Sequence, residues 1–499
     1  MKFINKDTIY YFIFLFLIIV VFFYKNELNN WLEGDIENIY LIYNVIITSN
    51  SIVPSVVDYP GNSSFVTYSL MLKLISFFDN LVILNLNDLI NNARPELILN
   101  RIYIYLKLIQ HFYAFLIAVL TFILLNFVIK NKRNSCLLTC VFISSPPFIE
   151  NLTRLRIDID SLLFFLISIF FLTLSAKKSL NNFFIFFSGF FLCFSLFSKT
   201  AIIFLTFSIP IISLFILRKN INLKNIFQEF KDKQLYFLFI VFNLFQLILI
   251  NVFKEIFTFI FLITNNLFYF SFYIFFSIFF KSINVKKVNF CLLIFIIGFI
   301  FSIILMYIVA LDLTKIYFVL NPIATFVYQI DITDSKNFLS LLTFMFDGSS
   351  NIKISYLDFI LLFIFFYLFF KNLKKKIIVN LLLFSLFLIY KIIFISKYSL
   401  YYDIYPLFLL IILIAVNSEL KSSYVTIIYS IIFITSLYVN SKYLLNTSYN
   451  KIIKDDSVCY FKELNKKEFE NMIAHENFLL YYAPKFAVYE FVQKLCENK

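Results

Sequence analysis

Long apolar runs separated by short polar connections make up most of this chain of 499 residues. Runs such as 10–24 and 235–251 approach the roughly 20 residues that an α-helix needs to cross a bilayer. We count about thirteen of them, near residues 9–23, 103–129, 136–149, 161–176, 183–197, 200–217, 235–252, 257–280, 288–311, 356–370, 377–395, 404–416 and 424–439. The pattern predicts an all-α polytopic membrane protein with about 11–13 transmembrane helices.

Two intervals are too long to be simple turns between such runs. Residues 24–102 contain amphipathic stretches near 36–50 and 63–79, each typical of a helix that lies in the membrane interface. Two prolines and a glycine between them predict an irregular path. Residues 312–355 form a second long loop, whose length and polarity suggest a mobile lid. A loop that carries its own helices usually does more than connect.

Composition and charge support the membrane class. The chain is 61% hydrophobic and 15% charged, with a mean hydropathy of +0.87, which is more apolar surface than a soluble fold can hide. The net charge of +13 is concentrated in connections such as 218–233 and 371–376. With the N-terminus inside, these basic connections all fall on the inner side, as the positive-inside rule requires. The charge is therefore explained by topology, and nucleic acid is disfavoured as a partner.

The same topology places both long loops and the C-terminal tail outside the cytoplasm. We therefore divide the chain into a transmembrane domain, 1–439, and a small polar unit, 440–499. Cys459 and Cys496 both fall in this tail, where an oxidising exterior would permit a disulfide between them.

An acidic cluster follows the first apolar run. Glu33, Asp35 and Glu37 lie close together in a chain with only 30 acids. Asp35 follows Gly34 and precedes a helical pattern, so the simple alternative is a helix N-cap; that alternative leaves the two other acids unexplained. On a helix Asp35 and Glu37 would diverge by about 200°, so only one can readily face a given reacting atom. Such a carboxylate could deprotonate an acceptor hydroxyl or amine.

Further charges gather in short connections on the predicted outer face: Arg154, Arg156, Asp158, Asp160, Lys199 and Lys397. The planar guanidinium of Arg154 or Arg156 suits a phosphate. The alternatives are a self-paired charge cluster at a helix end and, for Lys199, a lysine that snorkels to the membrane surface.

Taken in order, these positions resemble the GT-C superfamily of integral-membrane glycosyltransferases, in particular the branch with protein O-mannosyltransferases and the lipid A aminoarabinose transferase. The resemblance covers about 9–417 and is one of order and topology. Its residues here are Asp35, Glu37, Tyr40, Tyr59–Pro60–Gly61, Pro146–Pro147, Arg154, Arg156, Asp160–Ser161–Leu162–Leu163, Gly189, Ser198–Lys199, Lys397–Tyr398 and Pro406. Ile36 separates acids that the family commonly has adjacent, and Lys397 stands in place of an arginine.

The resemblance implies an inverting hexosyl- or pentosyltransferase. It would move a sugar from a polyprenyl-phosphate donor to a lipid, glycan or protein acceptor, at a bacterial inner membrane with the site facing the periplasm. Asp35 or Glu37 would be the base: the spacing to Tyr40 favours Glu37, and the preceding Gly34 favours Asp35, which we prefer. The implied phosphate ligands are Arg154, Arg156, Lys199 and Lys397, with Tyr40, Tyr59, Asp158, Asp160 and Tyr398 in support.

The cofactor and the class of protein stay open at this point. Relatives in the superfamily differ in their use of a divalent metal, so we assign none. A transporter or flippase for a lipid-linked saccharide would also need cations at the interface, but would be expected to carry charges in mid-span and internal repeats. An O-antigen-type polymerase or ligase would be expected to rely on a large late outer loop.

Overall fold

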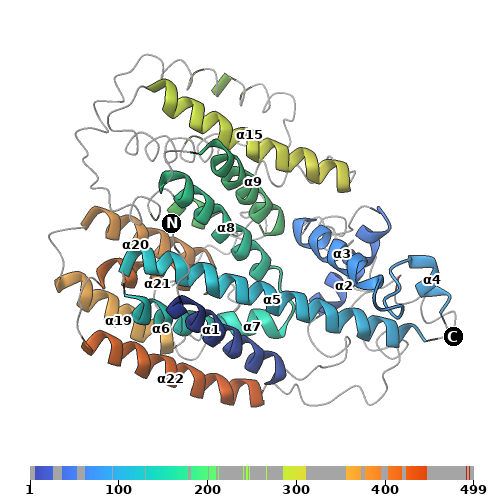
Figure 1. Ribbon diagram of the computed structural model, residues 1–499, viewed down its shortest axis with the longest axis horizontal. Helices are drawn as coiled ribbons and strands as arrows, with labels where there is room; N and C mark the ends of the chain where they lie inside the picture. Colours follow the sequence, from blue (N-terminus) through green and yellow to red (C-terminus); the bar gives the residue numbers. More distant parts are fainter. Residues whose placement is uncertain are drawn as a thin grey trace, which may run out of the picture.

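The computed structural model describes residues 6–25, 36–52, 62–92, 94–129, 131–177, 181–199, 202–209, 285–310, 356–371, 377–394, 403–418 and 423–446, with a few isolated residues besides. Every regular element in this part of the chain is a helix (Figure 1). The predicted loop at 312–355, nearly all of the tail and the pair Cys459 and Cys496 lie outside the described residues.

Most described helices lie on predicted apolar runs, although α5 begins eight residues before its run and α22 continues seven residues past its run, into the predicted tail. Apart from isolated residues, the predicted helices at 235–252 and 257–280, and the later part of the one at 200–217, lie outside the described residues. The described helices are α1 Lys6–Lys25, α2 Ile36–Ser49, α3 Asn62–Ser76, α4 Leu86–Ile90, α5 Pro95–Ile129, α6 Lys132–Ile143, α7 Pro146–Thr153, α8 Asp158–Lys177, α9 Asn182–Ser198, α10 Ile203–Thr206, α15 Val285–Ala310, α19 Tyr356–Lys371, α20 Ile377–Phe394, α21 Ile404–Asn417 and α22 Ser423–Asn446.

The prediction of one continuous helix over 136–149 is wrong. The helix breaks between Ile143 and Pro146, and α6 and α7 meet at a bend of 54°. Pro146 and Pro147 explain the break, because proline has no N–H to donate to the preceding turn and its ring clashes with it. At the first positions of α7 the same residues are well tolerated.

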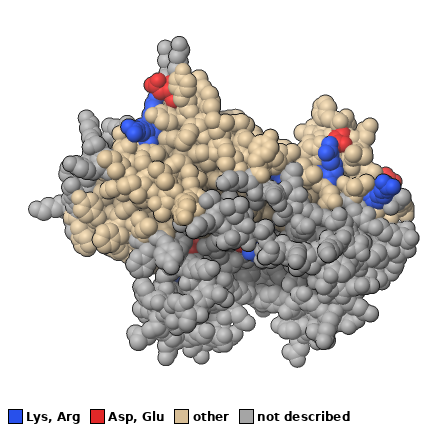
Figure 2. Space-filling view, turned by 90° about the horizontal axis from the view of Figure 1, so that it is seen from below, with Lys and Arg blue, Asp and Glu red and all other residues tan. Residues whose placement is uncertain are grey.

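Several helices are long and apolar enough to cross a membrane. In the described part these are Asp7–Tyr24, Leu97–Ile129 and Asp158–Ser175, and the bent pair of α6 and α7 is a fourth if it forms one span. Other apolar helices there are 10 to 17 residues long. Among the described residues on the face shown in Figure 2, the most prominent Lys, Arg, Asp and Glu side chains form one group toward the left and others at the right, with uncharged surface between them. This distribution suits an integral membrane protein.

The long helix α5 organises the described part. It runs along the long axis of the molecule, with α8 packed on one side and α1 and α6 on another (Figure 1). α21 is buried over its whole length and packs on α20, α19, α5 and α6. α2 and α3 pack together at one end of α5. None of the side chains described in α2 is exposed, whereas α3 keeps an exposed face. Among the described side chains of the two predicted interfacial helices, those of α3 offer a surface to lipid.

Serine pairs join α8 to α9. The Ser161 hydroxyl donates to the carbonyl oxygen of Ser195 at 3.1 Å, and the Ser195 hydroxyl donates back to the carbonyl oxygen of Ser161 at 2.8 Å. Further along, Ser168 and Ser188 make the same reciprocal bonds at 2.8 and 3.0 Å. The two pairs are in register for antiparallel helices, and small residues of this kind are what close packing in a membrane requires.

Glycines bring α9 and α15 into backbone contact. A Cβ atom on Gly189 would lie 2.0 Å from the carbonyl oxygen of Phe295, and one on Gly298 would lie 2.1 Å from that of Phe186. Neither distance is compatible with a side chain, so both glycines are required for this helix crossing.

We expect Gly189→Ala to lower the free energy of unfolding in detergent by about 1–3 kcal/mol, because the added methyl group must push the helices apart. Alanine has a higher helix propensity than glycine, so a lower free energy of unfolding in this variant would come from the close contact between the helices. Ile297→Ala, at a position that is 47% exposed on α15, is the control and should change it by less than about 0.5 kcal/mol. A Gly189→Ala protein as stable as the wild type would contradict the crossing.

Candidate functional site

The turn between α7 and α8 carries charges into the core. Arg154 stays at its edge: it is 29% exposed, and its Nε pairs with Glu150 Oε1 at 2.6 Å. Leu155 is buried with φ 49°, a left-handed conformation that costs an L-residue about 1–2 kcal/mol. Arg156 follows and is 3% exposed. The Gln110 amide of α5 donates to the carbonyl oxygen of Arg156 at 2.9 Å and so holds the turn against α5.

Two buried acids open α8. Asp158 and Asp160 stand two residues apart, so their side chains leave the helix in nearly opposite directions. Asp158 Oδ1 accepts a hydrogen bond from the Tyr405 hydroxyl of α21 at 2.8 Å. Asp160 Oδ1 accepts one from the Tyr68 hydroxyl of α3 at 2.8 Å. The first turn of α8 is therefore tied to two different neighbours.

Each acid keeps one oxygen without a hydrogen bond. Asp158 Oδ2 and Asp160 Oδ2 are both buried and have no hydrogen-bond partner in the described part of the chain. The Ser64 hydroxyl lies beside Asp160, but not in hydrogen-bonding geometry. Buried carboxylate oxygens normally have donors, because an unsatisfied one costs about 1–3 kcal/mol. These two oxygens are therefore available to the hydroxyl groups of a ligand.

Lys199 joins the cluster from the end of α9. Its backbone N–H bonds to the carbonyl oxygen of Ser195 at 3.1 Å, and the residue is 1% exposed. Burial lowers the pKa of Lys199 to about 8; the charge of Asp158 opposes this shift, and that of Arg156 adds to it. A lysine that snorkels to water would be exposed, so that alternative does not fit the structure.

Stacked tyrosines form a second layer around the acids. The Tyr68 ring stacks on Tyr113 of α5 with centroids 5.8 Å apart, and the Tyr405 ring stacks on Tyr390 of α20 at 6.0 Å. The Tyr390 hydroxyl accepts a hydrogen bond from the backbone N–H of Leu205 at 2.9 Å. Burial and the charge of Asp160 raise the pKa of Tyr68 well above its usual value, so its hydroxyl stays protonated and donates.

A buried ion pair lies at the start of α21. Lys391 Nζ of α20 is 2.7 Å from Asp403 Oδ1, and both side chains are less than a tenth exposed. Asp403 stands two residues before Tyr405, the residue that binds Asp158. The pair therefore fixes the end of α21 that carries the tyrosine.

The structure brings together part of the predicted site. Arg156, Asp158, Asp160 and Lys199, which come from two segments of the chain, form one buried cluster, and Arg154 lies at its edge. The backbones of Glu37 and Tyr40 lie in α2, but their side chains are outside what the structure describes. Also outside the described residues are Asp35, Tyr59, Lys397 and Tyr398.

Sequence reasoning missed Tyr68, Tyr405 and Lys391. Nothing in the sequence distinguishes these two tyrosines from the others among 32. In the part that the structure describes, no three His, Cys, Asp or Glu side chains form a group that could hold a metal ion. The carboxylates of Asp158 and Asp160 bind tyrosines on different helices, so they do not converge on one point where an ion could sit between them.

The cluster combines two cations with two carboxylates in a buried place. Arg156 and Lys199 would pair with an anion such as a phosphate, and the open oxygens of Asp158 and Asp160 would accept hydrogen bonds from hydroxyl groups. A sugar phosphate carries both kinds of group.

No protein-family model matches the chain, and neither curated proteins nor solved structures give a match.

Double-mutant cycles test the two tyrosine–carboxylate bonds. We expect Tyr68→Phe with Asp160→Asn, and Tyr405→Phe with Asp158→Asn, to show coupling energies of about 0.5–3 kcal/mol in the free energy of unfolding. The crossed cycle of Tyr68→Phe with Asp158→Asn is the matched control and should give a smaller coupling. Equal coupling in the crossed and the bonded pairs would show that the bonds are not those described.

Proposed function

We propose that this protein is a multi-pass membrane glycosyltransferase that moves a hexosyl or pentosyl group from a polyprenyl-phosphate donor to a lipid, glycan or protein acceptor. The observation that carries this proposal is the buried cluster in which Arg156 and Lys199 lie with Asp158 and Asp160. In this proposal the chain has about 11–13 spans in a bacterial inner membrane, with the site on its outer side.

The lipid-linked donor explains why the cations are buried. Its tail lies in hydrocarbon, so its phosphate must meet cations close to the apolar core. Away from water, the charges of Arg156 and Lys199 act more strongly on a phosphate than they would in solvent. When the bond between sugar and phosphate breaks, negative charge grows on the departing phosphate, and cations already in place stabilise it without reorganisation. The open oxygens of Asp158 and Asp160 would orient the sugar hydroxyls.

The acidic cluster would supply the base. α2 packs against α3, and α3 carries Tyr68, which binds Asp160. α2 is therefore linked to the buried cluster through one helix. Asp35 directly precedes α2 and Glu37 lies in its first turn, so either carboxylate could deprotonate an acceptor that enters from this end.

Transport of a lipid-linked saccharide is the second candidate, because one observation favours it. Lys107 and His111 lie inside α5 and are 2% and 4% exposed. Ionisable residues buried within spanning helices commonly mark a transport pathway. An assay must therefore separate movement of a lipid-linked sugar from its chemical transfer.

Binding of the carrier phosphate is the first test. We expect a polyprenyl monophosphate to raise the unfolding temperature of the wild type saturably in detergent. Lys199→Gln and Arg156→Gln should weaken its affinity about 10–100-fold, since a hydrogen bond to a charged group contributes about 1.5–3 kcal/mol. Arg133→Gln, at an exposed position in the first turn of α6, is the matched control. Equal affinity of all variants for polyprenyl monophosphate would show that Lys199 and Arg156 do not bind the phosphate.

The pH dependence of this binding gives an internal control. The lowered pKa of Lys199, about 8, means that its ammonium loses its charge as the pH rises through that value. The affinity should therefore fall between pH 7 and pH 9, a range in which a phosphomonoester stays doubly charged (its second pKa is about 6). Lys199→Arg keeps its charge throughout and should bind with little change over the same range.

Turnover is the second test. A panel of labelled polyprenyl-phosphate hexoses and pentoses would be supplied to the protein in vesicles, and label would be followed both in the acceptor fraction and across the bilayer. We expect Asp35→Asn to lower covalent transfer about 10²–10⁴-fold, as loss of a general base does, while leaving polyprenyl-phosphate binding unchanged; Glu37→Gln is the comparison. Label that crosses the bilayer without covalent transfer would instead establish the transporter.

A further inference from the structure

A second apolar surface lies outside the buried core, on one face of α3 and the turn after it. Its large side chains are between 57% and 91% exposed, and we call them the α3 stripe: Leu70, Leu74, Phe77, Phe78 and Leu81. Leu70 and Leu74 are four residues apart and so lie on one side of α3, while Tyr68 and Leu72 on its other side are fully buried. Phe77, Phe78 and Leu81 follow in the turn after the helix. α3 therefore has two apolar sides, and protein covers only one of them.

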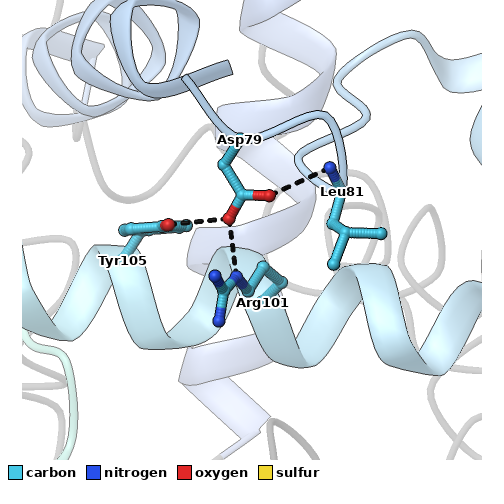
Figure 3. A network of polar contacts seen from close by, with 4 residues as sticks. All are labelled: Asp79, Leu81, Arg101 and Tyr105. Atoms are coloured by element: carbon cyan, nitrogen blue, oxygen red, sulfur yellow. Dashed lines mark hydrogen bonds and ion pairs between the residues drawn. The ribbon is translucent and has the colours of Figure 1, made fainter. Parts of the chain in front are cut away.

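A network of polar contacts holds the end of the stripe rigid (Figure 3). Asp79 Oδ2 accepts hydrogen bonds from Arg101 Nε at 2.6 Å and from the Tyr105 hydroxyl at 2.7 Å. Asp79 Oδ1 accepts one from the backbone N–H of Leu81 at 3.0 Å. The turn that carries Phe77 and Phe78 is therefore held against α5, and in it these side chains are 80% and 91% exposed.

The stripe is continuous with the exposed face of a helix that could cross a membrane. Arg101 and Tyr105 lie on the face of α5 that continues to Leu108 and Phe112, which are 42% and 50% exposed. From Tyr105 to Ile129, α5 rises about 36 Å at 1.5 Å per residue, enough for a hydrocarbon core of about 30 Å. The residues of α5 before Tyr105 are therefore not needed to cross the hydrocarbon core. The polar network thus stands where α5 would leave the hydrocarbon.

The charges around the stripe suit an anionic surface. Lys73 and Arg94 are exposed, and the Arg101 side chain is 44% exposed. Of the acids whose side chains the structure describes in this region, Asp79 is held inside the network, where the Tyr105 hydroxyl and then Arg101 lower its pKa, and Asp88 on α4 is exposed. Cations beside exposed Phe and Leu are typical of segments that bind at the headgroup level.

We propose that the α3 stripe is immersed in the headgroup–acyl boundary of a bilayer containing anionic phospholipids, and that the contacts of Asp79 with Arg101 and Tyr105 fix the depth at which α5 enters it. Phe77 and Phe78 enter the acyl boundary, and Lys73, Arg94 and Arg101 face lipid phosphates. This proposed contact of the α3 stripe with the membrane holds whether the protein is a transferase or a transporter.

Tryptophan fluorescence in vesicles tests the depth. Trp31 is the one tryptophan of the chain, so Phe78→Trp and Phe112→Trp would each be made with Trp31→Phe and placed in vesicles of phosphatidylcholine and phosphatidylglycerol. The vesicles would contain brominated lipids, with the bromines either high in the acyl chains, near the headgroup, or deep in them, near the bilayer centre. We expect high bromines to quench Phe78→Trp more strongly than deep ones, and the reverse for Phe112→Trp. If Trp31→Phe does not fold, each variant would be compared with the wild type, both keeping Trp31.

Two more comparisons test the charge and the network. Bromines carried on phosphatidylglycerol should quench Phe78→Trp more than the same bromines on phosphatidylcholine at equal mole fraction, and Lys73→Gln should reduce this difference. Asp79→Asn should remove the preference for high bromines, while Asp88→Asn, at an exposed acid outside the network, should leave it unchanged.

Several outcomes would overturn the proposal. Quenching of Phe78→Trp by acrylamide but not by lipid would place the stripe in water. Quenching by neither would show that a second copy or another protein covers it, and quenching mainly by deep bromines would place it in the hydrocarbon core. Equal quenching by the two lipid classes would remove the anionic partner.

Discussion

The described structure depends on the removal of four charged groups from water. Each buried ion costs several kcal/mol even after the protein relaxes around it, and four lie within one cluster: Arg156, Asp158, Asp160 and Lys199. The surroundings compensate in specific ways. Tyr68 and Tyr405 donate hydrogen bonds to the acids, and acidic and basic side chains lie together in the cluster. The left-handed turn at Leu155 places Arg156 in the core immediately before α8 begins. Apolar residues in place of buried charges are often as stabilising or more so, so helix packing alone does not account for these four side chains.

The helix packing around the cluster encloses it. Reciprocal bonds between Ser161 and Ser195 join α8 to α9 directly beneath the acids and Lys199, and Gly189 brings α15 onto the same α9. On the other side, α21 reaches the cluster through Tyr405, and the Lys391–Asp403 pair fixes the start of α21. In the proposed site, this enclosure would limit the screening of the cations by water when a phosphate binds.

Much of the helical layout follows from the sequence, because apolar runs of spanning length have few other stable solutions. The ends of helices are harder to predict than their positions. Pro146 and Pro147 indicate that α6 must end before them, but the apolar run continues past both prolines and by hydropathy alone looks like one helix. The charges at 156–160 and at Lys199 could be predicted to meet, since both follow from topology. The tyrosines could not, because Tyr68 and Tyr405 lie 92 and 247 residues from the acids they bind. Such pairings depend on the crossing of α3, α8 and α21, which no local pattern encodes.

The central claim is that the buried cluster holds the phosphate of a lipid-linked sugar donor. A structure of the protein with bound polyprenyl phosphate tests it most directly. The account predicts the phosphate within hydrogen-bonding distance of Arg156 and Lys199, with the prenyl chain leaving between helices toward lipid. A phosphate bound elsewhere, with Arg156 and Lys199 still enclosed as they are here, would contradict the account.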